Sequence, residues 1–251
     1  MTPDLLRMRR IFRPDGRAVI VALDYGLSGF TIPDLGDKVE RVVAGGADAV
    51  LLTAGQARHH AHLLGRCGLI LSVQDGRDDI DAVVLEAARM GADGIKAIFY
   101  THRPDQVQQV AWVARYATAC EAWGIPLLAE MIPVSFQERS AHTTENVAQA
   151  VQHAVEAGAH FLKVPYTGDP EGFRRITSQC PVPIVVLGGP RTEDVRAFLG
   201  FVKAAIDAGA SGVAIGRNVW GHPHPERLTA ALVALVHDGA TVDEAAALLE
   251  G

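Results

Sequence analysis

The chain alternates short apolar runs with longer stretches in which apolar and polar residues follow helical spacing. A Gly-Ala-Asp phrase or a close relative precedes several of these runs, and its glycine stands where an amphipathic helix would end. Clear copies cover residues 46–52, 91–98, 158–164 and 209–215, and looser copies cover 124–130 and 180–186. Together with residues 18–24 and 68–72, these segments predict eight strands.

Helical patterns occupy the stretches around the predicted strands, near residues 36–45, 56–64, 78–89, 106–122, 143–157, 170–178, 194–208, 225–236 and 242–249. Strand–helix alternation of this kind is typical of a parallel sheet, and eight right-handed crossovers close most simply into a barrel. An open doubly wound sheet is the alternative, but Leu23-Asp-Tyr-Gly26 lacks the glycine spacing of a nucleotide-binding turn. We therefore predict an α/β protein with one domain, a (β/α)8 TIM barrel over residues 1–251.

Composition narrows the possible partners and the compartment. A net charge of −6 without a basic stripe argues against nucleic acid and against an anionic membrane surface. We find no apolar stretch of bilayer length and no signal-peptide pattern at the N-terminus. The three cysteines, Cys67, Cys120 and Cys180, lack metal-ligand spacing. Reduced thiols in a cytoplasmic protein are therefore expected.

Ionisable residues fall on three consecutive predicted strands: Lys96, Glu130 at the end of its strand, and Lys163. Burial disfavours the ammonium form of lysine, and a neutral amine can attack a carbonyl. Inward-facing side chains of neighbouring strands, ~4.8 Å apart, can meet. Two lysines with one carboxylate suit imine chemistry, in which the glutamate moves protons. An ion cluster that only links the strands is the alternative interpretation.

Glycine-bearing segments follow the seventh and eighth predicted strands, Leu187-Gly-Gly-Pro-Arg-Thr192 and Ile215-Gly-Arg-Asn218. In a (β/α)8 barrel, active sites lie at the carboxyl ends of the strands, and these two loops often bind phosphate. Glycine lets a phosphate approach backbone N–H groups, and arginine supplies a bidentate charge. We predict a phosphate site formed by Gly188, Gly189, Gly216 and Arg217.

The histidines of Arg58-His-His-Ala-His62 open a helical pattern without an acidic partner at ligand spacing. A solvated helix face is the interpretation we favour for them. No metal and no other cofactor is expected.

Over nearly its whole length the sequence resembles the class I aldolases of the DeoC/FbaB type, especially archaeal-type fructose-bisphosphate aldolase and 2-amino-3,7-dideoxy-heptulosonate synthase. The resemblance rests on Leu23-Asp-Tyr-Gly26, Ala49-Val-Leu-Leu52, Leu162-Lys-Val-Pro-Tyr-Thr-Gly-Asp169, Gly188-Gly-Pro-Arg-Thr192 and Gly212-Val-Ala-Ile-Gly-Arg-Asn-Val219. It implies that Lys163 is the Schiff-base lysine, that Asp24 is an active-site carboxylate, and that the glycine loops bind substrate phosphate.

One segment departs from that subgroup, which has a tyrosine proton donor in a Met-Tyr-Pro-Arg-Gly segment. Ile132 stands in the place of this tyrosine, in Met131-Ile-Pro-Val-Ser135. Glu130 lies two residues earlier, on the same strand face. The pattern of Lys96, Glu130 and Lys163 is similar to that of the tagatose-bisphosphate aldolase branch, where a glutamate is the acid/base and a second lysine assists.

We therefore expect a metal-independent aldolase that acts on phosphorylated ketone and aldehyde substrates, with dihydroxyacetone phosphate as the donor. The acceptor would be glyceraldehyde 3-phosphate or an amino-aldehyde such as aspartate semialdehyde. Tyr166 is a further candidate for substrate binding, and Tyr25, Tyr100 and Tyr166 are reserve proton donors. A related isomerase or acyltransferase, and a non-catalytic phosphosugar-binding barrel, are the alternatives. We also expect a homo-oligomer.

Overall fold

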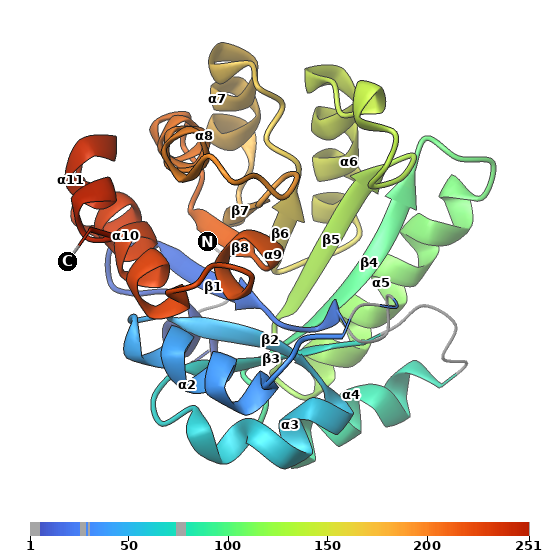
Figure 1. The fold of residues 1–251 in the computed structure, drawn as a ribbon. Helices are drawn as coiled ribbons and strands as arrows, with labels where there is room; N and C mark the ends of the chain where they lie inside the picture. Colours follow the sequence, from blue (N-terminus) through green and yellow to red (C-terminus); the bar gives the residue numbers. More distant parts are fainter. Residues whose placement is uncertain (1–5, 26–28, 30, 74–78, 251) are drawn as a thin grey trace.

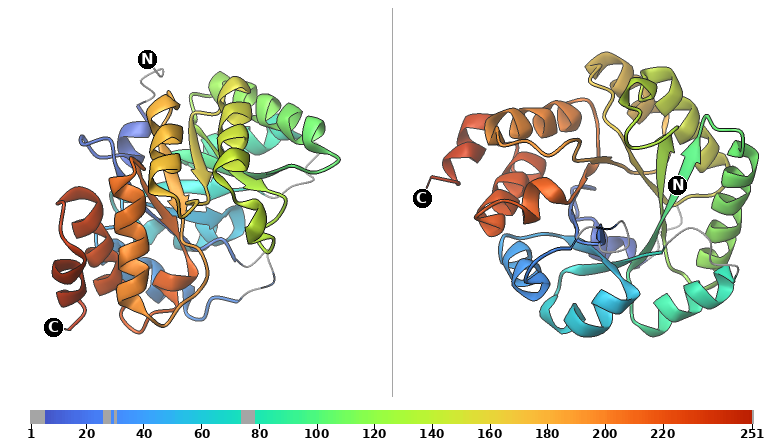
Figure 2. Two further views of the ribbon diagram at one scale, coloured as in Figure 1. Left: turned by 90° about the horizontal axis from the view of Figure 1, so that it is seen from above. Right: turned by 45° about the vertical axis from the view of Figure 1, so that its right-hand side comes forward.

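The computed structural model describes residues 6–25, 29, 31–73 and 79–250, which form a closed barrel of parallel strands surrounded by helices (Figures 1 and 2). The strands, in barrel order, are β1 (Ala18–Ala22), β2 (Ala49–Thr53), β3 (Gly68–Ser72), β4 (Gly94–Thr101), β5 (Leu127–Pro133), β6 (Phe161–Val164), β7 (Ile184–Leu187) and β8 (Gly212–Ile215). The barrel closes because β8 pairs with β1. The predicted (β/α)8 fold is confirmed.

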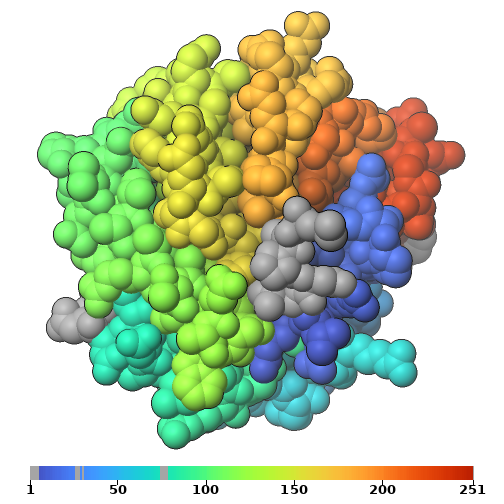
Figure 3. Space-filling model, turned by 180° about the vertical axis from the view of Figure 1, so that it is seen from behind, coloured from blue at the N-terminus to red at the C-terminus, as the bar shows by residue number. Residues whose placement is uncertain are grey.

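The longer helices alternate with the strands up to β8, after which α10 and α11 follow one another, and Figure 3 shows the colours of the chain following one another around one face of the molecule. They are α2 (Leu35–Ala44), α3 (Ala54–His60), α4 (Ile80–Arg89), α5 (Gln106–Ala122), α6 (Thr144–Glu156), α7 (Pro170–Gln179), α8 (Val195–Asp207), α10 (Pro225–His237) and α11 (Val242–Ala247). Shorter helices are α1 (Met8–Ile11), η2 (Ala61–Leu63), η3 (Arg139–Ala141) and α9 (Arg217–Trp220). Within the described residues, no helix is both long and apolar enough to cross a bilayer.

Side chains alternate between two apolar layers because successive residues of a strand point to opposite faces. Ile20, Leu51, Ile70 and Leu128 belong to the layer inside the barrel. Their neighbours along the strands pack against the surrounding helices, as Phe99 does against Tyr116 of α5, with ring centroids 6.0 Å apart. The same alternation decides which polar side chains enter the barrel.

Strands β4 and β5 extend farther than their neighbours, as the two long arrows in Figure 1 show. Their pairing continues through Tyr100 with Ile132 and Thr101 with Pro133. Glu130 is therefore not at the end of its strand, as the sequence suggested, but in its middle. The reason is that Met131 and Ile132 are apolar and buried, so that they continue the ladder.

The amino-terminal end of the barrel is closed by α1 and the residue after it. Ile11 is fully buried, and the Phe12 ring meets Phe161 edge to face, with centroids 5.5 Å apart. Gly94 makes room for Ile11, since a Cβ atom at position 94 would lie 3.2 Å from the Ile11 side chain. The barrel interior is thus plugged at this end, a feature that the hydrophobic pattern did not predict.

A charged cluster near this end joins β1, β2 and α10. The Asp48 carboxylate accepts hydrogen bonds from the Val19 backbone at 2.7 Å and from Arg13 Nε at 2.5 Å. His237 Nε2 lies 2.9 Å from Asp48 Oδ2, and its Nδ1 lies 2.7 Å from Asp15 Oδ2. Both ring nitrogens can donate to carboxylates only when the imidazole is protonated.

We expect this cluster to make stability depend on pH. Burial opposes the charged form of His237, but its bonds to Asp48 and Asp15 outweigh burial and raise the pKa. The added stability is fully present below the ordinary histidine pKa of ~6.5 and is lost as the pH rises through the folded-state value. The melting temperature of the wild type should therefore fall more between about pH 6 and about pH 9 than that of His237→Gln. Parallel melting curves for the two proteins would contradict this expectation.

Candidate active site

Four ionisable side chains form a line across the carboxyl-terminal half of the barrel interior. Asp24 Oδ2 lies 2.9 Å from Lys96 Nζ, and Lys96 Nζ lies 3.0 Å from Glu130 Oε2. The other oxygen of this glutamate, Oε1, lies 2.8 Å from Lys163 Nζ. We call Asp24, Lys96, Glu130 and Lys163 the charged array, in which carboxylates and ammonium groups alternate.

Strand register explains why these side chains meet. Glu130 and Lys163 are paired residues of β5 and β6, so their side chains leave the sheet at the same level and on the same side. Lys96 pairs with Ser72 of β3 and lies two residues before Ile98, the partner of Glu130. Two-residue spacing keeps Lys96 on the same, inner face. Lys96, Glu130 and Lys163 thus come together as the sequence suggested.

Lys96 is a fixed cation at the centre of the array. Its ammonium contacts Asp24, Glu130 and also Ser72 Oγ at 3.1 Å, which matches its three N–H donors. Burial alone would lower the pKa of Lys96, but the two carboxylates raise it above its usual value. A lysine held in this state is not a nucleophile, so Lys96 is suited to holding the carboxylates in place.

Both carboxylates of the array are ionised near neutral pH. Burial opposes the ionisation of Asp24, yet the charges of Lys96 and Lys163 lower its pKa to about 2. The pKa of Glu130 is likewise lowered against the effect of burial, first by Lys163 and then by Lys96. Glu130 is therefore a proton acceptor in the resting protein, in direct contact with the Lys163 amine.

Lys163 differs from Lys96 because it lies at the edge of the array. Its side chain is 7% exposed, and it borders a small cavity of about 60 Å³ at the barrel mouth. Within the described part of the chain, its one carboxylate contact is Glu130. A lysine in this position can pass a proton from its ammonium group to Glu130, and the amine that results can meet a carbonyl that enters the cavity.

The predicted glycine loops form another side of the same cavity. A Cβ atom on Gly188 would lie 2.7 Å from the Ile215 side chain, and one on Gly216 would lie 2.3 Å from the Tyr25 ring. Gly189 has φ +63°, in the left-handed region that favours glycine. These positions need glycine for packing and backbone conformation, and they leave peptide groups beside the cavity.

Arg217 begins α9 and lies next to Tyr25 at the cavity. Its guanidinium carbon is 5.8 Å from the centroid of the Tyr25 ring, which also meets Trp220 edge to face at 5.8 Å. Burial raises the pKa of Tyr25, as do the charges of Asp24 and Glu130, so the phenol keeps its proton. The arginine is thus held by an aromatic ring on one wall of the site.

Asn218 joins the two glycine loops, a role that we did not predict from the sequence. Its amide nitrogen donates to the carbonyl oxygens of Gly188 at 3.0 Å and Pro190 at 2.9 Å. Its amide oxygen accepts from the Thr192 backbone at 3.0 Å. The asparagine stood inside the Ile215-Gly-Arg-Asn218 motif, but spacing alone could not show which loop it contacts.

Tyr166 lies apart from the charged array. Its ring packs against Phe173 of α7 at 5.1 Å and Phe201 of α8 at 5.5 Å, and it is not among the residues that line the cavity. A role for Tyr166 in substrate binding stays a prediction. Gly26, part of the motif that contains Asp24, lies outside the described residues.

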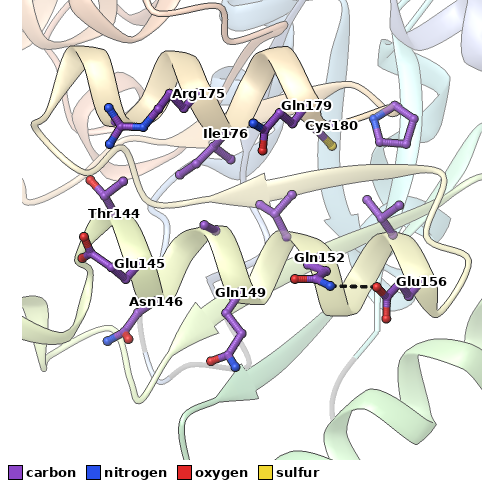
Figure 4. A pocket seen from close by; sticks show the side chains of 15 residues that line it. Thr144, Glu145, Asn146, Gln149, Gln152, Glu156, Arg175, Ile176, Gln179 and Cys180 are labelled. Carbon is purple, nitrogen blue, oxygen red and sulfur yellow. Dashed lines mark hydrogen bonds between the residues drawn. The ribbon is translucent and has the colours of Figure 1, made fainter.

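A larger hollow, of about 760 Å³, lies outside the barrel between α6 and α7 (Figure 4). Its labelled polar side chains include Gln152 and Glu156, which are hydrogen-bonded to each other at 2.9 Å. It contains neither a buried lysine nor a paired set of charges. The chemistry of the side chains therefore favours the small cavity beside Lys163 as the reactive site, despite its size.

Comparison with known proteins gives a consistent result. The profile described as "DeoC/LacD family aldolase" matches residues 18–222. Over 249 residues the chain is 33% identical to 2-amino-4,5-dihydroxy-6-oxo-7-(phosphonooxy)heptanoate synthase of Streptomyces griseus, with 94% of this chain and 91% of the relative covered. It is 34% identical over 253 residues to 2-amino-3,7-dideoxy-D-threo-hept-6-ulosonate synthase 1 of Archaeoglobus fulgidus, with 95% of this chain and 92% of the relative covered. A solved Schiff base-forming fructose-1,6-bisphosphate aldolase superposes with a TM-score of 0.80 at 29% identity, covering 93% of this chain and 99% of that one.

Proposed function

Since the chain belongs to the DeoC/LacD family and is a class I aldolase, we propose that it makes or breaks a carbon–carbon bond of a phosphorylated ketose through an imine on Lys163. The observation that carries this proposal is the direct contact between the Lys163 amine and the ionised Glu130 at the edge of a cavity. Dihydroxyacetone phosphate is the donor ketone that we propose. Side chains of this protein can carry out each proton transfer and the nucleophilic attack in the proposed reaction.

Imine formation needs one proton to move between Lys163 and Glu130. The lysine ammonium gives a proton to the carboxylate, and the resulting amine attacks the ketone to form a carbinolamine. Glu130 then returns its proton to the departing hydroxyl group, which leaves as water, and the iminium remains. Lys96 keeps the glutamate in position throughout.

Carbon–carbon cleavage uses the same glutamate as a base. The Glu130 carboxylate takes the proton of the hydroxyl group on the carbon next to the bond that breaks. The electrons of this bond move into the iminium, so an aldehyde leaves and an enamine stays on Lys163. Protonation of the enamine and hydrolysis of the iminium release the ketone and restore the amine.

Reduction of the iminium is the test of this function. Borohydride added together with dihydroxyacetone phosphate should inactivate the protein and leave a reduced adduct on the peptide that contains Lys163. Peptide mass spectrometry locates the adduct, and borohydride without the ketone is the control. An adduct on another lysine, or inactivation by chelators in place of borohydride, would overturn the proposal. Binding of the ketone without any adduct would also overturn it, because that is the result expected if the ion cluster is purely structural.

The substrate phosphate is proposed to bind between the glycine loops, with Arg217 as its charged contact. The backbone of Gly188, Gly189 and Gly216 approaches the cavity without side chains. Arg217 is held beside it by the Tyr25 ring. A charge-assisted contact to phosphate is among the stronger polar interactions that proteins make.

Replacing Arg217 by alanine should weaken binding of phosphorylated substrates more than it slows the chemical step. Loss of a charge-assisted contact costs ~2 kcal/mol, which corresponds to a KM about 30 times higher. Steady-state kinetics with dihydroxyacetone phosphate would measure the change, and Arg66→Ala, an exposed arginine before β3, is the matched control. An unchanged KM in Arg217→Ala would place the phosphate elsewhere.

A synthase that condenses the ketone with aspartate semialdehyde is the second candidate. The names of the two heptanoate and heptulosonate synthases, at 33% and 34% identity, favour it. It would use the same imine on Lys163, so only the identity of the aldehyde distinguishes the two functions. Product analysis with glyceraldehyde 3-phosphate and with aspartate semialdehyde decides between the two functions.

A further inference from the structure

The extended ends of β4 and β5 carry apolar side chains toward the barrel mouth. Ile98 and Tyr100 lie two and four residues after Lys96, and therefore on the same inner face. Ile98 pairs with Glu130 in the ladder, and Tyr100 pairs with Ile132. Ile132 itself is fully buried, so it supports these side chains from behind. We call Ile98, Tyr100 and the nearby Phe136 the apolar wall.

Exposure along β4 shows that this wall borders open space. Ile98 and Tyr100 are partly exposed, whereas Phe99 and Thr101, on the other face of the strand, are buried. Phe136 is 37% exposed, and its ring meets Tyr100 edge to face with centroids 6.2 Å apart. Since Phe136 also lines the cavity beside Lys163 and Glu130, the wall reaches the reactive groups.

Among the described residues, Arg103 and His142 lie near the wall, and both have partners. The Arg103 guanidinium lies over the Tyr100 ring, 5.0 Å from its centroid, and pairs with Asp105 at 3.5 Å. His142 Nε2 lies 2.9 Å from the Ser135 carbonyl oxygen, in the loop that carries Phe136. The glycine loops and Arg217 line the cavity from β7 and β8, so the mouth has one side suited to an anion and another suited to an apolar group.

We propose that the aldehyde partner of the reaction binds against the apolar wall and that its substituent is apolar and uncharged. This inference rests on the proposed imine at Lys163, because the phosphorylated ketone then occupies the side formed by the glycine loops. A phosphate or carboxylate placed against the Ile98 and Phe136 side chains would lose water without gaining hydrogen bonds from them. An apolar substituent would instead be removed from water on contact with Ile98 and Phe136.

Each step with such an aldehyde balances in protons and electrons. The Glu130 carboxylate removes a proton from the carbon next to the iminium, which gives the enamine and a neutral carboxyl group. The enamine carbon then bonds to the aldehyde carbon, and the aldehyde oxygen takes the proton from Glu130. Water hydrolyses the remaining iminium and frees the ketose product and Lys163.

The test compares three aldehydes with dihydroxyacetone phosphate as the donor: isobutyraldehyde, glyceraldehyde 3-phosphate and aspartate semialdehyde. We expect kcat/KM to be highest for isobutyraldehyde, by about tenfold or more. Phe136→Ala should lower this value about tenfold while borohydride trapping at Lys163 stays unchanged, and Phe136→Leu should keep most of it. Trp123→Ala, which changes an exposed aromatic residue at the end of α5, is the matched control.

The outcomes separate this inference from the function on which it rests. A Lys163 adduct together with a higher kcat/KM for either charged aldehyde would overturn the apolar acceptor alone. The same conclusion would follow if Phe136→Ala lowered kcat/KM equally for all three aldehydes. Absence of the adduct with the ketone alone would overturn both the imine and the inference built on it.

Discussion

Replacing Lys163 by methionine is expected to reduce aldol turnover by roughly 10⁴- to 10⁶-fold, because the covalent intermediate can no longer form. Methionine fills a similar volume but has no amine. Lys96 cannot substitute for it, since its three donors are engaged and its pKa is raised by Asp24 and Glu130, against the effect of burial. Turnover and borohydride trapping, measured on the same preparation, should both be lost.

Retention of the fold must be shown for this variant. Glu130 keeps Lys96 as a partner at 3.0 Å, so Lys163→Met does not leave an unpaired carboxylate in the barrel. Lys203→Met, which removes a lysine of α8 that pairs with Asp207, is the matched control and should retain full activity. Activity of Lys163→Met within tenfold of the wild type would rule out the lysine as the nucleophile.

Glu130→Gln is expected to slow carbon–carbon cleavage by ~10²- to 10⁴-fold, the usual cost of losing a positioned acid/base group. Glutamine preserves the shape but cannot take a proton, and the neighbouring Ile132 cannot do so either. The imine on Lys163 should still form, although slowly. Single-turnover cleavage and borohydride trapping, measured in parallel, separate the two steps.

The alternative proton donors are tyrosines, and a result in their favour would contradict the role of Glu130. Normal turnover of Glu130→Gln, together with a strong loss in Tyr25→Phe or Tyr166→Phe, would move the acid/base role to a tyrosine. Tyr25 is the nearer of the two, since it lines the cavity and its phenol stays protonated. Glu121→Gln, on α5, is the matched control for the change of charge.

The barrel could be predicted from the sequence because each helix and strand carries its own periodic signal. The expected helix over residues 106–122 coincides with α5, and the expected strand over 68–72 coincides with β3. The plug made by α1 and Phe12 gave no such signal, since a single turn is too short for a period. Its position depends on contacts with Phe161 and Gly94, which are distant in the chain.

The residues of the candidate site could be selected from the sequence, but their arrangement could not. Buried lysine and glutamate residues stand out in apolar strands, so Lys96, Glu130 and Lys163 could be selected. Strand register sets the height of each side chain, and no local pattern encodes it. The contact of Asp24 and Ser72 with Lys96, and the approach of Phe136 from its loop, therefore required the structure.

Within the part of the chain that the structure describes, the plug at the amino-terminal end leaves the carboxyl-terminal mouth as the entrance to the barrel, which has a consequence for kinetics. In the proposed reaction the ketone would have to reach Lys163 through this mouth before an aldehyde occupies the apolar wall. For the proposed reaction we therefore expect ordered substrate addition, with the ketone first on and last off. We expect excess aldehyde that enters before the ketone to act as a substrate inhibitor that competes with the ketone.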